Sequence, residues 1–138
     1  MRDVAILLHE TAGLIRRRFE QTARPEGLTL LQWRALGLLA QTGPMRQVAV
    51  GEALEASPMA ISDLAERLAS AGLVERARDP KDSRAKTLAL TAAGQERVTA
   101  MRTRSEVIFA EVFRDVSHTE AEALGHALTK IKRNLGDA

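Results

Sequence analysis

The stretch from residue 57 to residue 91 constrains the fold more than any other part of the chain, because it specifies a helix, a helix stop and two strands in a fixed order. Ser57 has the hydroxyl that an N-cap needs, and Pro58 fits the first helical position, where its missing N–H costs nothing. Gly72 is the residue type that ends a helix in the left-handed conformation. Between these signals, an apolar face recurs at helical spacing and consists of Ile61, Leu64, Ala65 and Leu68. The pattern predicts a helix over about 57–71.

A charged hairpin follows this helix. Residues 73–74 begin a strand that residues 86–90 can answer by alternation of apolar and polar positions. The segment 76–86 holds five Lys or Arg residues and two Asp residues, a net excess of three positive charges, and the Asp-Pro pair at 79–80 marks the turn. A helix presented by a compact core and followed by a basic hairpin is the layout of a winged helix. In that layout the helix fits the major groove of DNA, and the hairpin tip reaches the neighbouring backbone or minor groove.

The polar face of the helix and the hairpin supply the candidate DNA contacts. Exposed Met59 and Ala60 are easier to explain if they meet thymine methyl groups, whereas Asp63 would repel phosphate and can instead accept from cytosine N4. The alternative is a solvated surface whose hairpin cations pair with the two loop aspartates. Because the hairpin follows a capped helix with an exposed small-residue face, we favour DNA contact. The candidates are Ser57, Pro58, Met59, Ala60, Ser62, Asp63 and Arg67 on the helix, and Arg78, Lys81, Asp82, Arg84 and Lys86 on the hairpin.

The chain before this stretch is predicted to be helical. Residues 3–20 repeat apolar side chains at helical spacing, and the Pro and Gly of 22–28 indicate a loop. Thr29 and Gln32 form a capping box that opens a second helix, and residues 46–55 form a short third helix in front of the one at 57–71.

The chain after this stretch is predicted to contain two helices. A long helix starts at its cap, Thr91, and its apolar stripe continues to Val116, too far for a small winged-helix core to cover. One of two overlapping capping boxes, at 117–120 or 119–122, opens the final helix. The helices at both chain ends most simply bury their stripes against a second copy of the chain, which predicts a homodimer. The residues expected in its interface are Leu124, Leu128 and Ile131.

Composition excludes several classes of function. The chain has 138 residues with 45% hydrophobic and 28% charged side chains, which is ordinary for one soluble globular domain. Without cysteine, disulfides, thiolate metal sites and a thiol redox sensor are excluded, and 3% aromatic residues leave no stacking platform for single-stranded nucleic acid. The formal net charge of +2 is weakly basic, so the argument for DNA rests on the hairpin. No signal peptide or membrane-spanning run is found, which predicts a cytoplasmic protein without a membrane partner.

No catalytic or metal-binding motif stands out. The sequence has no H-E-x-x-H, P-loop, G-x-G-x-x-G or G-x-S-x-G motif, so we predict neither an enzyme nor a bound cofactor. His118, Glu122 and His126 are spaced four apart and could share a helix face. We expect no metal site there, because His118 should precede the cap and Glu122 should belong to the capping box.

With these residues in hand, the chain resembles a MarR-family transcriptional regulator. The resemblance rests on LTLLQWRAL (28–36), SPMAISDLAERL (57–68) and AGLVERARDPKDSRAKTLALTAAGQ (71–95), in which GLVER, D-P-x-D-x-R and L-T-x-x-G follow in order. It implies a triangular homodimer that binds DNA through the 57–71 helix and the wing. It also implies that Arg84 enters the minor groove while Asp82 steadies it, through a hydrogen bond that holds the guanidinium outward. Asp63, where the family often has arginine, and Gly51, which suggests a short or loose third helix, depart from the family pattern.

The predicted fold is mainly α with a small β-hairpin wing, in one domain over residues 1–138. It comprises a winged helix-turn-helix at about 29–91 and dimerisation helices at about 3–20 and 92–136. The predicted function is a homodimeric transcriptional regulator that binds double-stranded DNA. It is expected to be a repressor that is released by a small-molecule effector of aromatic or amphipathic character. The rival is a helical dimer that has lost DNA binding and acts through protein contacts. His9 and Trp33 are the candidate effector contacts, with packing at a helix interface as the alternative for both.

Overall fold

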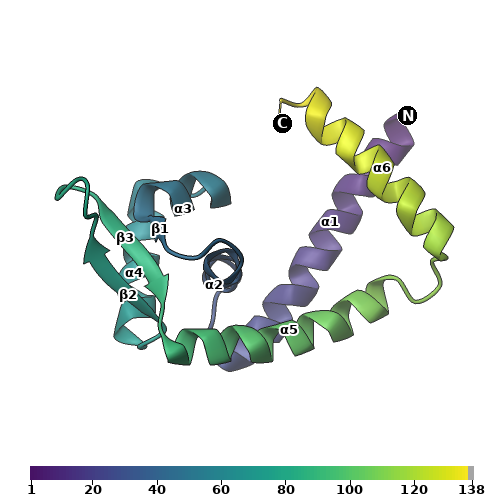
Figure 1. The fold of residues 1–138 in the computed structure, drawn as a ribbon. Coiled ribbons are helices and arrows are strands. Elements are labelled where there is room, and N and C mark those ends of the chain that lie inside the picture. The colour runs from purple at the N-terminus through teal and green to yellow at the C-terminus, as the bar shows by residue number, and fades with distance from the viewer. Residues whose placement is uncertain (137–138) are drawn as a thin grey trace. The chain divides into compact units, whose positions relative to one another are not determined.

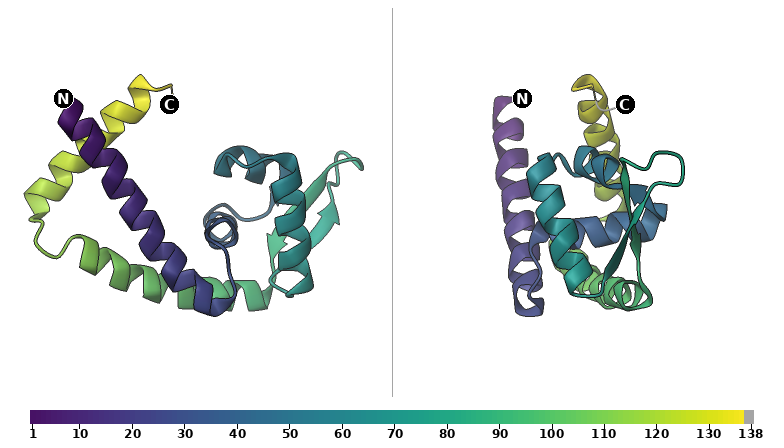
Figure 2. Two further views of the ribbon diagram at one scale, coloured as in Figure 1. Left: turned by 180° about the vertical axis from the view of Figure 1, so that it is seen from behind. Right: turned by 90° about the vertical axis from the view of Figure 1, so that its left-hand side faces the viewer.

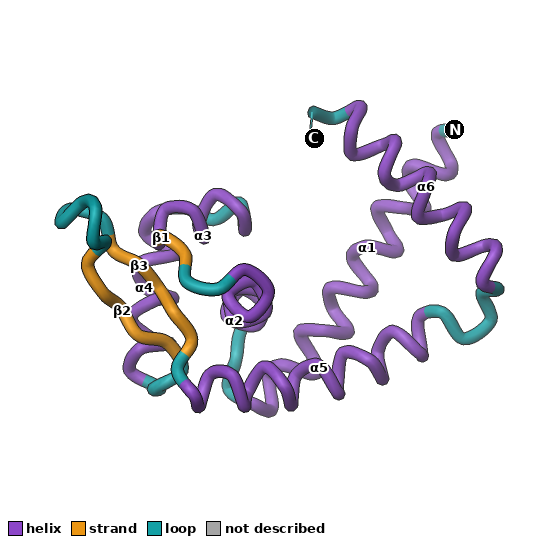
Figure 3. Tube along the Cα trace, viewed as in Figure 1, coloured by secondary structure: helices purple, strands orange, loops and turns teal. Residues whose placement is uncertain are grey.

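A computed structural model of the chain describes residues 1–136, and the last two residues of the predicted domain lie outside the described part (Figure 1). Contacts divide the chain into two compact units, residues 1–105 and the residues from Glu106 onward. Figure 3 shows the order of helices and strands along the chain. The helices are α1 (Arg2–Ala23), the short 3-10 helix η1 (Arg24–Glu26), α2 (Leu30–Thr42), α3 (Gln47–Leu54), α4 (Pro58–Ser70), α5 (Ala92–Val112) and α6 (His118–Asn134). The strands are β1 (Met45–Arg46), β2 (Val74–Arg78) and β3 (Lys86–Leu90). This confirms the mainly helical fold with a hairpin wing.

Side-chain caps fix the starts of the helices where the sequence predicted them. The Ala60 N–H donates to Ser57 Oγ at 3.1 Å, which satisfies one free N–H of α4. At α2, the Gln32 N–H donates to Thr29 Oγ1 at 3.1 Å, and the Thr29 N–H donates back to Gln32 Oε1 at 3.0 Å. Of the two boxes predicted for the last helix, the structure forms the one at 117–120.

The wing is part of a three-stranded antiparallel sheet in the order β1-β3-β2. Strands β2 and β3 pair as predicted, from Val74 opposite Leu90 to Arg78 opposite Lys86. The third strand, β1, places Arg46 opposite Thr87 and was not predicted. Two residues are too few to show an alternating pattern, so sequence periodicity cannot reveal such a strand.

Helix α4, the sheet and α2 enclose one apolar core in the first unit. Ile61, Leu64 and Leu68 of α4 are each at most 3% exposed, and Figure 2 shows α4 beside β2, on which it packs. The first turns of α5 contribute Val98 and Met101 to the same core. A face of this kind contributes about 1.5–3 kcal/mol for each large side chain that it buries, before entropy is counted. The core therefore holds α4 with its polar face outward.

Two glycines are required where backbone segments approach closely. A Cβ at Gly51 of α3 would lie 3.1 Å from Ile61 Cγ1, so this glycine lets α3 pack against α4. Of the two alternatives that Gly51 suggested, the structure shows the short helix, eight residues long, and not the loose one, because Gly51 is buried against α4. A Cβ at Gly94 would collide with the carbonyl oxygen of Leu73. The Thr91 hydroxyl accepts from the Gly94 N–H at 3.0 Å and donates to the Gly72 carbonyl at 2.6 Å, so the L-T-x-x-G motif fastens α5 to the segment after α4.

Some predicted boundaries are wrong. Helix α1 continues to Ala23, and the predicted loop after residue 22 contains η1, where Pro25 occupies an early helical position that needs no N–H. Glu26 of η1 forms ion pairs with Arg97, at 3.9 Å, and with Arg104, which tie this segment to α5. Helix α5 ends at Val112, before the end of the predicted stripe at Val116.

The helices at the chain ends leave apolar side chains uncovered. Leu7 and Leu14 of α1 are each 61% exposed, and Leu124 and Ile131 of α6 are 45% and 39% exposed. Within the described residues, α6 has no buried residue, although its apolar positions recur at helical spacing. None of the described helices combines the length and apolar character needed to cross a membrane.

Candidate nucleic-acid interface

The outer face of α4 presents the residues that the sequence proposed for DNA contact. Met59 is 82% exposed at the start of the helix, next to the exposed N-cap Ser57. Ser62, Asp63 and Arg67 are exposed along the same helix, whereas Ala60 is half-buried. A helix with this mixture of small, apolar and polar side chains has the size and chemistry to enter a major groove.

Asp63 and Arg67 are joined on this face. The Arg67 Nε donates to Asp63 Oδ2 at 3.0 Å, one helical turn away. Both side chains are well exposed, so the pair contributes only about 0.3–0.5 kcal/mol to stability. It nevertheless changes the expectation for DNA, because the guanidinium neutralises the carboxylate that was expected to repel phosphate. This i,i+4 pair is visible in the sequence but was not predicted.

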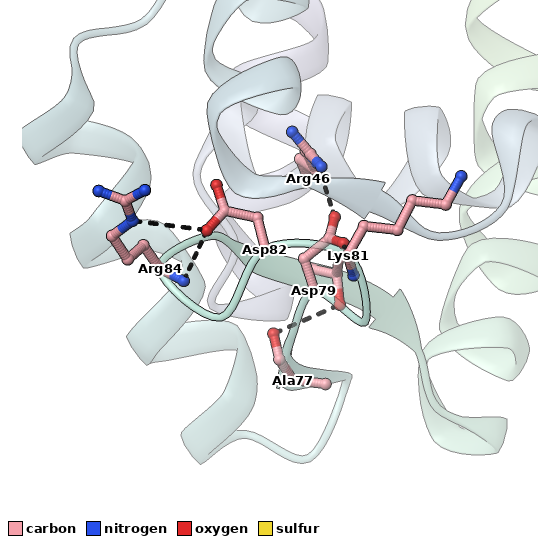
Figure 4. Close-up of polar contacts among 7 residues, drawn as sticks. Arg46, Ala77, Asp79, Lys81, Asp82 and Arg84 are labelled. Carbon is pink, nitrogen blue, oxygen red and sulfur yellow. Dashed lines mark hydrogen bonds and ion pairs between the residues drawn. The ribbon is translucent and has the colours of Figure 1, made fainter.

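At the wing tip, Asp82 orders Arg84 (Figure 4). The backbone N–H of Arg84 donates to Asp82 Oδ1 at 3.0 Å, and Arg84 Nε lies 3.7 Å from the same oxygen. The predicted hydrogen bond from the guanidinium is therefore wrong in detail, because the bond comes from the backbone and the side chain makes an ion pair. With 94% of its side chain exposed, Arg84 projects from the loop as a minor-groove contact requires.

Asp79 pairs with a cation that lies outside the hairpin. Its Oδ2 accepts from Arg46 Nε at 2.6 Å, and its Oδ1 accepts from the Lys81 N–H at 2.7 Å. These two contacts, the backbone one being the stronger, hold the pKa of the Asp79 carboxyl below its ordinary value of 3.8. The alternative in which both loop aspartates neutralise cations inside the hairpin holds only for Asp82, because the partner of Asp79 lies in β1.

The remaining hairpin cations are free for an external anion. Arg78 stands directly opposite Lys86 in the β2–β3 ladder, and Lys81 is exposed in the turn. Like charges directly opposite each other destabilise a sheet, so a phosphate between them would relieve repulsion. Arg46 was missed by sequence reasoning. No local signal pointed to it, because the hairpin itself offers cations that could pair with Asp79 and Arg46 lies 33 residues away.

The structure separates the two candidate effector residues. Trp33 is 7% exposed and packs edge-on against Phe19, with ring centroids 6.2 Å apart, which agrees with the packing alternative. Both rings also line a hollow of about 490 Å³ between α1 and α2, together with Arg16 and Arg34. His9 is exposed and is not among the residues that line it, so the structure does not bring His9 and Trp33 to one site.

The histidines of α6 adopt a different arrangement from the one predicted. Because the capping box uses Glu120, His118 is the first residue of α6 and Glu122 remains outside the box. His118 Nε2 lies 3.3 Å from Glu122 Oε1 at the surface. Among the described residues, no three His, Cys, Asp or Glu side chains are grouped as a metal ion would need.

The chain is similar in sequence to known regulators of transcription. Residues 28–86 match the model of the MarR family, a range that contains α2, α3, α4 and most of the wing. The HTH-type transcriptional repressor MdtR of Bacillus subtilis is 24% identical over 131 residues, which cover 95% of this chain and 84% of MdtR.

Solved structures resemble the whole chain. BpsR of Bordetella bronchiseptica, whose DNA binding is regulated by 6-hydroxynicotinic acid, is 27% identical with a TM-score of 0.82, over 94% of this chain and 98% of BpsR. A mutant MarR of E. coli complexed with operator DNA is 22% identical with a TM-score of 0.83, over 94% and 93% of the two chains. This second likeness shows a shared fold.

Proposed function

The chain carries the DNA-binding domain of a MarR-family transcriptional regulator, and from this premise we propose that it is a homodimeric repressor that a small molecule releases from DNA. Regulators of this family bind DNA and are not enzymes. The observation that carries the proposal is the pairing of a capped helix, whose polar face is exposed, with a wing tip whose Arg84 is 94% exposed. A protein of this kind works on chromosomal DNA, so we place it in the cytoplasm.

The dimer is supported by the apolar side chains that the chain ends leave exposed. Leu124 and Ile131 belong to a helix without a buried residue in the described part of the chain. Burying such side chains against an identical surface contributes about 25 cal/mol for each Å² removed from water. A two-fold dimer would also present two α4 helices to two half-sites about one DNA turn apart.

The effector site is proposed at the hollow between α1 and α2. Phe19 and Trp33 give it an aromatic wall, while Arg16 and Arg34 supply two cationic groups against the single carboxylate of Glu55. This lining suits a planar aromatic acid, whose ring packs on the aromatic side chains and whose carboxylate pairs with a guanidinium. The DNA binding of the relative BpsR is regulated by 6-hydroxynicotinic acid, which has this chemistry.

The rival function, a helical dimer that acts only through protein contacts, loses its main sequence support. That support was the phosphate-repelling charge of Asp63, which Arg67 neutralises at 3.0 Å. The modest net charge of +2 is the support that remains.

Selection of bound fragments from a random duplex pool tests the proposed function. We expect recovery of a two-fold symmetric sequence, and affinity for it should fall steeply with added salt as phosphate contacts are replaced by counterions. The protein-contact rival instead predicts no enriched sequence. For the effector, Trp33 fluorescence should change when an aromatic acid releases the DNA, and release without such a change would remove the hollow from the proposal.

A further inference from the structure

An ion pair between Arg46 and Asp79 joins the wing to the rest of the sheet. Arg46 Nε and Asp79 Oδ2 are 2.6 Å apart, and the two residues are 33 positions apart in the sequence (Figure 4). Charge-assisted hydrogen bonds of this length are among the stronger ones in proteins. The Asp79 side chain is only 10% exposed, so salt screens the pair less than it screens a fully solvated one.

Both partners are fixed to different parts of the structure. Arg46 pairs with Thr87 in the sheet and is the residue directly before α3. Asp79 lies at the base of the wing loop, where its N–H donates to the Ala85 carbonyl at 2.8 Å and its Oδ1 accepts from the Lys81 N–H at 2.7 Å. The ion pair therefore connects the sheet beside α3 to the two ends of the loop that carries the wing tip.

Arg46, the partner of Asp79, lies on the side of the wing where Arg84 is found. Arg46, Arg84, Lys86 and Asp82 line one hollow of about 460 Å³ between α3 and the wing. A loop free to swing about its two strands would have to be ordered when it meets DNA, and that ordering reduces affinity. A loop already held from its base avoids this loss.

We propose that Arg46 is a positioning residue for the wing, which binds Asp79 and thereby holds the loop in the orientation from which Arg84 reaches the DNA. This inference rests on the proposed DNA-binding function. It assigns to Arg46 a role through the wing and not a direct phosphate contact, although its side chain is 50% exposed. The two roles make opposite predictions for Asp79.

Asp79→Asn gives the sharpest test, because charge and positioning predict opposite signs. The amide oxygen can still accept from the Lys81 N–H, but the amide NH2 group then faces Arg46, which can only donate, so the bond to Arg46 is lost. Removing a negative charge beside DNA would by itself strengthen binding, whereas loss of positioning should weaken it about threefold to thirtyfold. Glu75→Gln is the matched control, since it removes an exposed carboxylate from the same hairpin and should leave affinity equal or slightly higher. Unchanged or tighter binding by Asp79→Asn overturns the proposal.

Arg46→Ala and the double variant Arg46→Ala/Asp79→Asn separate positioning from phosphate contact. Positioning predicts that the double variant binds no more weakly than either single variant, and that Arg46→Ala leaves the slope of log affinity against log salt unchanged. A phosphate contact predicts additive losses and a slope smaller by about one, and that result contradicts the proposal. Arg46→Lys should restore part of the affinity, because an ammonium can pair with Asp79 but lacks the guanidinium fork.

A measurement without DNA keeps this inference separate from the proposed function. Amide hydrogen exchange of Asp79, Lys81 and Ala85 in the free protein should become faster in Arg46→Ala, while amides of α4 keep their protection. Unchanged exchange in the loop overturns the proposal whether or not the protein binds DNA. If the wild type binds no duplex while the loop still loosens in Arg46→Ala, the proposed function fails and the ordering role of Arg46 stands.

Discussion

The region from α2 to β3 and the helices at the chain ends use the same kinds of apolar residue in opposite ways. Leu36, Ile61 and Leu88 in the first region are at most 1% exposed. Leu14 of α1 and Leu124 of α6 have similar helical spacing around them and are 61% and 45% exposed. The first region, together with the end of α1 and the first turns of α5, therefore encloses its core within one chain. The apolar side chains farther along the two end helices stay uncovered.

This difference divides the functions of the molecule. A region that closes its own core can hold α4 and the wing in a fixed geometry, which a DNA-reading surface needs. In the proposed dimer, a second copy covers the uncovered stripes, and the end helices then set the spacing between the two DNA-reading surfaces. Substitutions in the first region should accordingly destabilise the fold, whereas substitutions in the end helices should weaken the proposed dimer.

The largest effect is expected when charge is placed on the uncovered stripe of α6. The double variant Leu124→Asp/Ile131→Asp should raise the dimer dissociation constant by a thousandfold or more, about 4 kcal/mol, because both copies lose apolar burial and gain repulsion. The melting temperature of the α2 to β3 region should stay close to that of the wild type. Sedimentation equilibrium measures the first quantity, and a double variant that remains dimeric at micromolar concentration would show that the interface lies elsewhere.

A slightly smaller effect is expected from overpacking the place where α5 meets the first region, at Leu73. Gly94→Ala should destabilise the fold by about 3 kcal/mol, because the added methyl group collides with the Leu73 carbonyl and one backbone segment must move. Gly37→Ala in α2 is the control, since no atom lies within 4 Å of its added Cβ and alanine favours a helix by up to about 1 kcal/mol. Urea unfolding of both variants checks this, and equal stability of the two would refute the close approach at Gly94.

At the wing, Arg84→Ala should weaken binding to every duplex alike. The minor groove offers mainly width and A·T content, so sequence preference should hardly change, and the salt slope should fall by about one. Titrations against cognate and scrambled duplexes at two salt concentrations measure this. Wild-type affinity in this variant would remove Arg84 from the interface.

Asp63→Ala should act on discrimination instead of overall affinity. Loss of the carboxylate also frees Arg67, so the affinity for non-specific DNA should stay level or rise. Discrimination at one base pair should fall by roughly 1–3 kcal/mol if Asp63 accepts from cytosine N4. Glu66→Ala, at an exposed neighbouring position of α4, is the control. Equal losses on cognate and scrambled duplexes would contradict a base contact.

The smallest effect is expected on the free energy of unfolding at low pH. It can be measured for one carboxylate in each region, Asp79 in the wing and Glu120 in α6. The Lys81 N–H and Arg46 lower the pKa of Asp79 below 3.8, and the Ser117 backbone N–H and hydroxyl lower that of Glu120 below 4.5. Each group therefore stabilises the fold fully above these values, and the contribution is lost as the pH falls through the lower pKa of the folded state. Asp79→Asn and Glu120→Gln should each flatten the loss of stability below about pH 4.5. Unfolding curves from pH 7 to pH 3 that run parallel to the wild type would contradict this.

Local signals in the sequence predicted most of the fold. Ser57 and Thr29 each placed a helix start correctly, because a cap is a contact between residues three positions apart. Ser117 was one of the two starts that the sequence left open for the last helix, and the structure uses it. The alternation at 86–90 likewise identified the second wing strand. Such features depend on neighbours that the sequence displays side by side.

Features that depend on distant partners were not predictable in the same way. The bond between Arg46 and Asp79 requires that β1 join the sheet beside the wing, and a two-residue strand leaves no pattern. The fit of Gly51 against Ile61 and of Gly94 against Leu73 depends on how closely two segments approach, which composition does not record. The Asp63–Arg67 pair is the exception, because its spacing was available from the start.

The stoichiometry and salt dependence of the complex with a selected duplex test the central claim most directly, because they join the two regions in one measurement. We expect two chains on each duplex that holds two half-sites one turn apart. The slope of log affinity against log salt should be roughly −5 or steeper, because a dimer that neutralises about six phosphates releases a similar number of counterions. A single chain bound to the full site, or an affinity that hardly changes with salt, would contradict it.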